Sequence, residues 1–195
     1  YLMAGLLAWT LFSEILGRCL TVFISNGNLM KKMSFPKITL PTIIIGSSLL
    51  NNVLLFVSML GIFFALGHGF SATVLWLIPL TLLLATLALS LGLILGIFNV
   101  FLRDVGQLIP IILQIWFWFT PIVYPITIIP EKYHALLMNI NPIFPIVNAY
   151  QQVIVYDKAP NLDSGLLPII VITLVLLAMS LFLFRRAGEE MADVL

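Results

Sequence analysis

Long apolar runs with few charges occupy most of the chain, and they predict helices that cross a membrane. A hydrocarbon core about 30 Å thick needs roughly 20 apolar residues in a helix. Four runs reach this length, and a fifth, residues 107–120, is shorter and rich in aromatic side chains. Because lipid cannot satisfy unpaired backbone polar groups, all five are expected to be helical. The four long runs are residues 2–24, 43–66, 74–102 and 166–184.

Basic residues in the short connections predict the orientation of these helices, because Lys and Arg are held on the cytoplasmic side. Placing every basic connection in the cytoplasm puts Tyr1 and residues 121–165 outside, with five spans between the two faces. The basic residues that set this arrangement are Lys31, Lys32 and Lys37, then Arg103, and finally Arg185 and Arg186.

The pattern therefore predicts one all-α integral membrane domain over residues 1–195. It has a cytoplasmic connection at 25–41 and a cytoplasmic tail at 185–195. Tyr1 would lie outside, at the start of a hydrophobic run that has no charged leader. Such a start is unlike a signal peptide. We expect a further span and a cytoplasmic N-terminus to precede Tyr1.

Composition supports a lipid environment and removes several function classes. Hydrophobic residues make up 62% of the chain and charged residues 9%, and the mean hydropathy is +1.16. The net charge of +1 lacks the basic footprint of nucleic-acid binding. The chain has one cysteine, Cys19, and two histidines far apart, so the sequence predicts no metal site. It has no phosphate-binding loop for ATP and no recognisable catalytic motif, and we expect a protein that is not an enzyme.

Charged and amide side chains inside the expected spans mark positions of interest. Glu14 and Arg18 are four residues apart in the first run, so they share one helix face in a favourable order. They are interpreted either as a mutually neutralised pair or as part of a pathway or gate. Asn51 and Asn52 favour interhelical hydrogen bonding over substrate contact. A membrane-embedded glycosyl- or acyltransferase would need an acid at this depth, and Glu14 alone could provide it.

Prolines interrupt the apolar sequence that follows the aromatic run. Pro121 and Pro125 prevent a long helix, yet residues 122–129 remain apolar. Irregular backbone at membrane depth is tolerated only against protein or a cavity. We therefore expect a re-entrant element at 122–129, a second broken apolar segment at 135–150, and together a gate on the outer side over residues 121–150.

Three stretches resemble the permease subunit of type-2 ABC exporters, and within these the polysaccharide branch that exports O-antigen or capsule. They read KKMSFPKITLP at 31–41, FNVFLRDVGQLIPIILQIWFWFTPIVYP at 98–125 and NPIFPIVNAYQQVI at 141–154. The resemblance covers essentially the whole chain. Family members have six spans, preceded by a cytoplasmic amphipathic helix, so the first span would be missing here.

The resemblance implies a function and a set of partners. Such permeases are homodimers in the bacterial inner membrane, and each copy binds a separate subunit that binds ATP, so this chain itself would hold no cofactor. The substrate would be a lipid-linked polysaccharide, with teichoic acid, a drug or another lipid as the alternative. By the same resemblance, Lys31, Lys32, Lys37, Arg103 and Asp104 would meet the ATPase.

The resemblance also assigns the aromatic region to the exit of the channel. Aromatic faces can stack on sugar rings while offering few fixed hydrogen bonds, which suits a conduit that must bind weakly. An ordinary aromatic belt at the membrane interface is the simpler interpretation of the same residues. The channel or gate residues implied are Trp116, Phe117, Trp118, Tyr124, Pro121 and Pro125.

Overall fold

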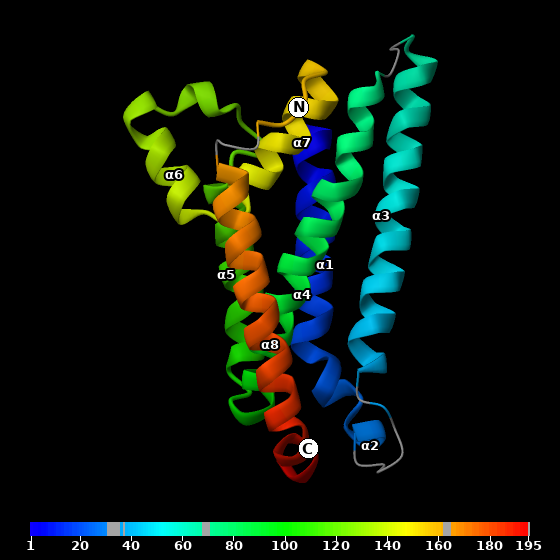
Figure 1. Cartoon of the computed structure of the whole chain (residues 1–195), viewed down its shortest axis with the longest axis vertical. Helices are drawn as coiled ribbons and strands as arrows, with labels where there is room; N and C mark the ends of the chain where they lie inside the picture. The colour runs from blue at the N-terminus through cyan, green and yellow to red at the C-terminus, as the bar shows by residue number, and fades with distance from the viewer. Residues whose placement is uncertain (31–35, 37, 68–70, 162–164, 195) are drawn as a thin grey trace.

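The computed structural model describes residues 1–30, 36, 38–67, 71–161 and 165–194, and these form helices and turns (Figure 1). The expected all-α fold is confirmed. The α-helices are α1 (Leu2–Ser25), α2 (Gly27–Met30), α3 (Thr39–Ala65), α4 (Leu77–Phe101), α5 (Val105–Phe119), α6 (His134–Ile140), α7 (Phe144–Tyr156) and α8 (Leu167–Val194). Short 3-10 helices are η1 (Ala72–Trp76), η2 (Ile126–Ile128) and η3 (Glu131–Tyr133).

Four helical segments in the described part of the chain are long and apolar enough to cross a membrane, which confirms the four long runs. α5 is the fifth apolar helix, but its 15 residues are fewer than a span needs. At 1.5 Å per residue it is about 22 Å long, against a hydrocarbon core of about 30 Å. The four long segments are Leu2–Ser25, Thr39–Ala65, Ala72–Phe101 and Leu167–Ala187.

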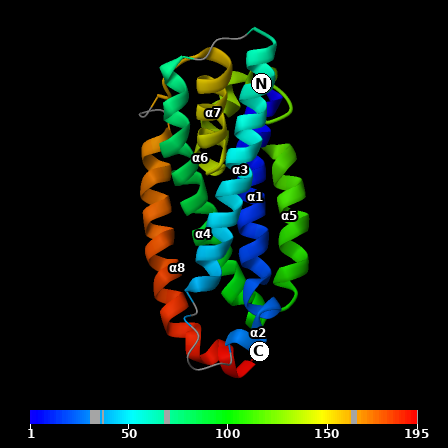
Figure 2. The ribbon, with the colours of Figure 1, turned by 90° about the vertical axis from the view of Figure 1, so that its right-hand side faces the viewer.

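The long helices differ in how much of their surface other helices cover. Within an apolar stretch of 18 residues in each segment, the buried share is 61% in α1 and 67% in η1–α4, but 22% in both α3 and α8. α1 and α4 therefore form the centre of the bundle, and α3 and α8 lie at its periphery (Figure 2). Many of the exposed side chains of α3 and α8 are large and apolar, so lipid can cover this surface.

Two glycines let α1 and α4 approach backbone to backbone. A Cβ atom at Gly92 would lie 2.7 Å from the Cβ of Cys19, and one at Gly96 would lie 2.5 Å from the Cys19 carbonyl oxygen. Neither distance leaves room for a side chain. Further along α4, the Asn99 Nδ2 donates a hydrogen bond to the Leu20 carbonyl at 2.8 Å. These contacts make α1 and α4 one closely packed pair.

The two ends of the bundle carry different features. The end we call the basic end holds α2, the turn with Arg103 between α4 and α5, and the part of α8 with Arg185 and Arg186 (Figure 1). The opposite end, called the Tyr1 end, holds Tyr1, α6 and α7. The helix directions therefore agree with the orientation predicted from the basic residues.

The region after α5 differs in detail from the expected pair of broken half-spans. Residues 122–129 hold only η2, because closely spaced prolines interrupt the helical hydrogen bonds. The two helices of this region are instead α6 and α7, joined by a turn at Asn141. Figure 1 shows α6 standing away from the bundle, whereas α7 packs against α1. α7 also extends to Tyr156, beyond the expected limit of 150.

Candidate translocation surface

One face of α1 carries polar and small residues at helical spacing over the middle half of the helix. These residues remain half-buried or exposed, whereas the opposite face of α1 is buried against α4. Figure 2 shows α1 between α3 and α5. The face, here called the polar stripe, consists of Thr10, Ser13, Glu14, Gly17, Arg18 and Thr21.

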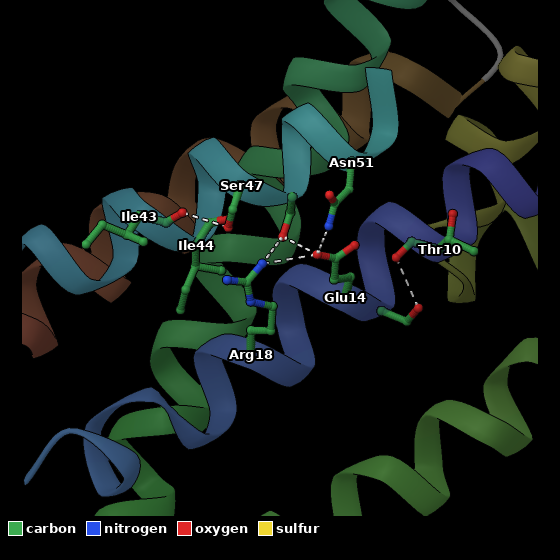
Figure 3. A network of polar contacts seen from close by, with 9 residues as sticks. Thr10, Glu14, Arg18, Ile43, Ile44, Ser47 and Asn51 are labelled. Atoms are coloured by element: carbon green, nitrogen blue, oxygen red, sulfur yellow. Dashed lines mark hydrogen bonds and ion pairs between the residues drawn. The ribbon is translucent and has the colours of Figure 1, made fainter. Parts of the chain in front are cut away.

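The centre of the polar stripe is an ion pair tied to α3 (Figure 3). The Arg18 Nη1 lies 3.1 Å from the Glu14 Oε1. The same Oε1 accepts hydrogen bonds from the Ser48 Oγ at 3.0 Å and from the Asn51 Nδ2 at 3.1 Å. Three donors thus converge on one carboxylate oxygen near the middle of two membrane-spanning helices, which offsets part of the cost of placing its charge there.

Both charged groups keep part of their surface uncovered. The side chain of Arg18 is 40% exposed and that of Glu14 is 31% exposed. Within the described part of the chain, Nη1 is the guanidinium nitrogen that makes hydrogen bonds, to Glu14 and to Ser48. The remaining guanidinium N–H groups and the second Glu14 oxygen are therefore available to a ligand.

A further polar contact joins α3 to α1 nearer the Tyr1 end. The Asn52 Nδ2 donates to the Leu7 carbonyl at 3.0 Å, and Asn52 is buried. The predicted interhelical role of Asn51 and Asn52 is confirmed. Since α3 buries little of its surface, these amides and Ser48 fasten it to the bundle near its middle.

The aromatic residues of α5 divide between two faces. The rings of Trp116 and Phe12 lie 5.7 Å apart, and those of Phe117 and Trp9 lie 5.5 Å apart, so Trp116 and Phe117 pack on α1. Trp118, in contrast, is 61% exposed. Of the expected aromatic residues, Trp116 and Phe117 therefore pack between helices, whereas Trp118 is open to a ligand or to lipid.

Asn141 connects the end of α5 to the turn between α6 and α7. Its Oδ1 accepts from the Trp116 Nε1 and from the Ile143 backbone N–H, both at 3.1 Å. Its Nδ2 donates to the Thr120 Oγ1 at 2.9 Å. The Asn141 and Thr120 side chains are both buried. This cluster, called the Asn141 lock, fixes the start of the proline-rich segment.

The residues after the Asn141 lock are anchored by their backbone. The buried Pro121 carbonyl accepts a hydrogen bond from the Gln151 Nε2 of α7 at 3.0 Å. The Tyr124 hydroxyl donates to the Trp118 carbonyl at 3.0 Å. Burial raises the pKa of the Tyr124 phenol above its ordinary value. Pro125 is exposed and begins the turn into η2.

The residues expected to meet an ATPase are only partly within the described structure. Lys31, Lys32 and Lys37 lie outside the described residues. Arg103 and Asp104 are exposed in the turn between α4 and α5. A buried side chain stabilises this turn, because the Asn99 Oδ1 accepts a hydrogen bond from the Gly106 N–H at 2.8 Å.

Sequence reasoning missed Ser48, Asn141 and Thr120. The polar stripe could have been found, because its members recur every three or four positions within an apolar run. Asn141 gave no such signal, since its partners are 25 and 21 residues away along the chain. The described residues contain no group of three or more His, Cys, Asp or Glu side chains that could hold a metal ion.

Comparison with known proteins places this arrangement in a family. The O-antigen export system permease protein RfbA of Myxococcus xanthus is 29% identical over 198 residues, which cover 99% of this chain and 74% of that protein. Two proteins of that name from Klebsiella pneumoniae are 24% and 23% identical over 197 residues, with 100% of this chain and 74% of theirs covered. Residues 1–155 match the ABC-2 type transporter family. With most of its length inside that match and four helices able to span a membrane, the chain belongs to the ABC-2 type transporter family of multi-pass membrane proteins.

Proposed function

We propose that this chain is the permease subunit of an exporter that moves a lipid-linked polysaccharide outward across the bacterial inner membrane. A separate ATP-binding subunit would supply the energy, and two copies of the permease would enclose the path. The relatives from Myxococcus xanthus and Klebsiella pneumoniae, named as O-antigen export permeases, support this substrate class. In this assignment the basic end is cytoplasmic and the Tyr1 end faces outward.

The observation that carries the proposal is the polar stripe of α1. Hydroxyl and charged groups inside a membrane are costly unless they face protein or a water-filled cavity. These groups lie on the one face of α1 that its own bundle leaves incompletely covered. A hydrated polymer needs such a surface, with polar groups that contact it weakly at many places.

The outer part of α5 would then form the exit. A groove of about 480 Å³ lies between α5 and α6, lined mainly by apolar side chains that include Trp116 and Phe119. Its floor is held by the Asn141 lock. We assign α6 and α7 to the gate, with the exposed Trp118 available to contact a passing sugar. Arg103 and Asp104, exposed at the opposite end, are assigned to the contact with the ATP-binding subunit.

Replacing Ser13 with leucine tests the path. Ser13→Leu places a bulky apolar group in the polar stripe while α1 keeps its helical character. We expect polysaccharide at the cell surface to fall about tenfold, because a conduit must stay polar and open. Surface polysaccharide is measured by antibody labelling of cells whose only permease is the variant, with permease content determined by immunoblot.

Ser58→Leu is the matched control, because Ser58 is exposed on the peripheral helix α3, outside the polar stripe. Its hydroxyl bonds to its own helix, at the Leu55 carbonyl, as Ser13 does at Trp9. Export should be unchanged by Ser58→Leu. Normal export by Ser13→Leu at normal permease content would refute the assignment of the polar stripe to the path.

A further inference from the structure

A crevice separates α1 and α3 at the basic end of the bundle, below the Glu14–Arg18 pair. Its volume is about 480 Å³. The α1 wall provides Arg18, Thr21, Ser25 and Asn26, and the α3 wall provides Thr39 together with apolar residues. The apolar lining is Val22, Leu40, Ile43 and Ile44. The crevice is thus amphipathic, because both helices contribute polar as well as apolar side chains to its lining.

Several polar groups of this crevice have unused hydrogen-bonding capacity. Arg18 uses Nη1 for Glu14 and Ser48, and its other N–H groups make no hydrogen bond within the described residues. The hydroxyls of Thr21 and Thr39 donate no hydrogen bond to any described residue. Ser25, in contrast, already donates to the Thr21 carbonyl at 2.9 Å. Within the described part of the chain, the donors without a partner therefore come from both sides of the crevice.

The charge of the surrounding sequence favours an anion. The connection from Asn26 to Thr39, which joins the two walls, carries three lysines and no acidic residue. Glu14 is the acidic group nearest to Arg18, and its Oε1 is saturated by three donors. Arg18 places its positive charge at the end of the crevice nearest to Glu14 and Ser48, to which its Nη1 is hydrogen-bonded. Basic pockets between membrane helices on the cytoplasmic side bind anionic lipid headgroups.

We propose that this crevice binds the phosphate of an anionic phospholipid of the cytoplasmic leaflet. Arg18, Thr21 and Thr39 hold the phosphate oxygens, and one acyl chain lies against Leu40 and Ile43. The apolar part of the lining suits an acyl chain and the polar part suits a phosphate, so an amphipathic lipid satisfies both parts of the lining. The crevice shares Arg18 and Thr21 with the polar stripe, but its lipid binding can be measured without any exported substrate.

Native mass spectrometry of the detergent-purified permease, with its ATP-binding subunit, tests the site. The probes are dioleoyl phosphatidylglycerol and dioleoyl phosphatidylcholine, which differ in headgroup charge. We expect the Kd for phosphatidylglycerol to be about fivefold lower, the factor that corresponds to one cation near an anionic headgroup. The double variant Thr21→Val/Thr39→Val should lose this preference, because it removes hydroxyl donors without changing charge or volume.

Control variants separate loss of the site from loss of structure. Thr42→Val/Thr86→Val changes two threonines outside the crevice whose hydroxyls bond to their own helices, and it should keep the preference. Glu14→Gln/Arg18→Gln removes both charges at once, so no unpaired charge remains, and it should abolish the preference. Equal binding of the two lipids by the unaltered protein would overturn the proposal, as would an equal loss in the threonine control.

A polyprenyl diphosphate is the third probe, because a lipid-linked substrate also carries phosphate. If phosphatidylglycerol is the ligand, the diphosphate should not displace it at equal concentration. Displacement at a tenth of the phosphatidylglycerol concentration or less would assign the crevice to an exported lipid carrier and overturn the phospholipid assignment. Failure of Ser13→Leu to reduce export would leave this result unaffected, so the two proposals can fail separately.

Discussion

Two of the polar networks among the described residues differ in charge and in burial. The Asn141 lock is neutral and buried, and each of its polar groups has a partner within the chain. The network of Glu14, Arg18, Ser48 and Asn51 is charged and half-exposed, and it keeps free donors and a free acceptor. Saturated buried groups fix one conformation, whereas unsaturated groups remain available to a ligand. The comparison favours a structural role for the first network, and the second has the free groups that the proposed binding surface requires.

The largest effect on stability is expected from the Asn141 lock. Asn141→Leu keeps the side-chain size but leaves the Ile143 N–H and the Trp116 indole N–H without a partner, whereas the Thr120 hydroxyl keeps its hydrogen bond to the Trp116 carbonyl. Each buried group left unpaired costs about 1–3 kcal/mol, so the free energy of unfolding should fall by about 3 kcal/mol. Unfolding in mixed detergent micelles, followed by tryptophan fluorescence, measures the change.

Asn148→Leu is the control for this variant. Asn148 lies half-buried on α7, and no hydrogen bond of its side chain is seen among the described residues. Its replacement should change stability by less than about 1 kcal/mol. Equal losses of unfolding free energy for Asn141→Leu and Asn148→Leu would show that the Asn141 lock adds no more stability than an ordinary polar side chain. The first network would then not be structural in the sense proposed.

An intermediate effect is expected from the Glu14–Arg18 pair. Glu14→Gln and Arg18→Gln each leave one charge unpaired at membrane depth, whereas the double variant leaves none. The double variant should therefore be more stable than the sum of the two single losses predicts, by about 1–2 kcal/mol. Thermal unfolding of the four proteins of the cycle gives this coupling energy. Additive losses would show that Glu14 and Arg18 do not depend on one another.

The smallest effect is expected at the edge of the Asn141 lock. Tyr124→Phe removes the hydrogen bond to the Trp118 carbonyl, but Tyr124 is only half-buried, so water can replace it. The expected loss is about 0.5–1 kcal/mol. The same fluorescence assay measures it. A loss as large as that of Asn141→Leu would extend the rigid region beyond Thr120 and would require the lock to be redefined.

The sequence predicts the long helices because burial in lipid depends on length and local composition. Residues 2–24 and 74–102 could be identified in this way. The Glu14–Arg18 pair could also be predicted, because an i,i+4 spacing within a helix determines the distance. Sequence spacing alone is thus sufficient to predict a contact when the two residues lie within one or two turns of the same helix.

The arrangement after α5 could not be obtained in the same way. Pro121 and Pro125 show that no long helix forms, but they do not determine where the next helix begins. Asn141 sets that boundary through contacts with Trp116 and Thr120, which depend on how α5 packs on α1. The contact of Ser48 with Glu14, 34 residues away, likewise depends on the tertiary fold. Such contacts have no periodic signal in the sequence.

The position of the charged pair within a single helix has a consequence for biosynthesis. Glu14 and Arg18 are both in α1, so they can neutralise one another as soon as that helix has formed. α1 can then leave the translocation channel for the lipid before α3 has been synthesised. Ser48 and Asn51 arrive about 30 residues later and complete the network. The order of synthesis thus matches the order in which the charges need partners, and no stage of insertion leaves an isolated ion in the bilayer.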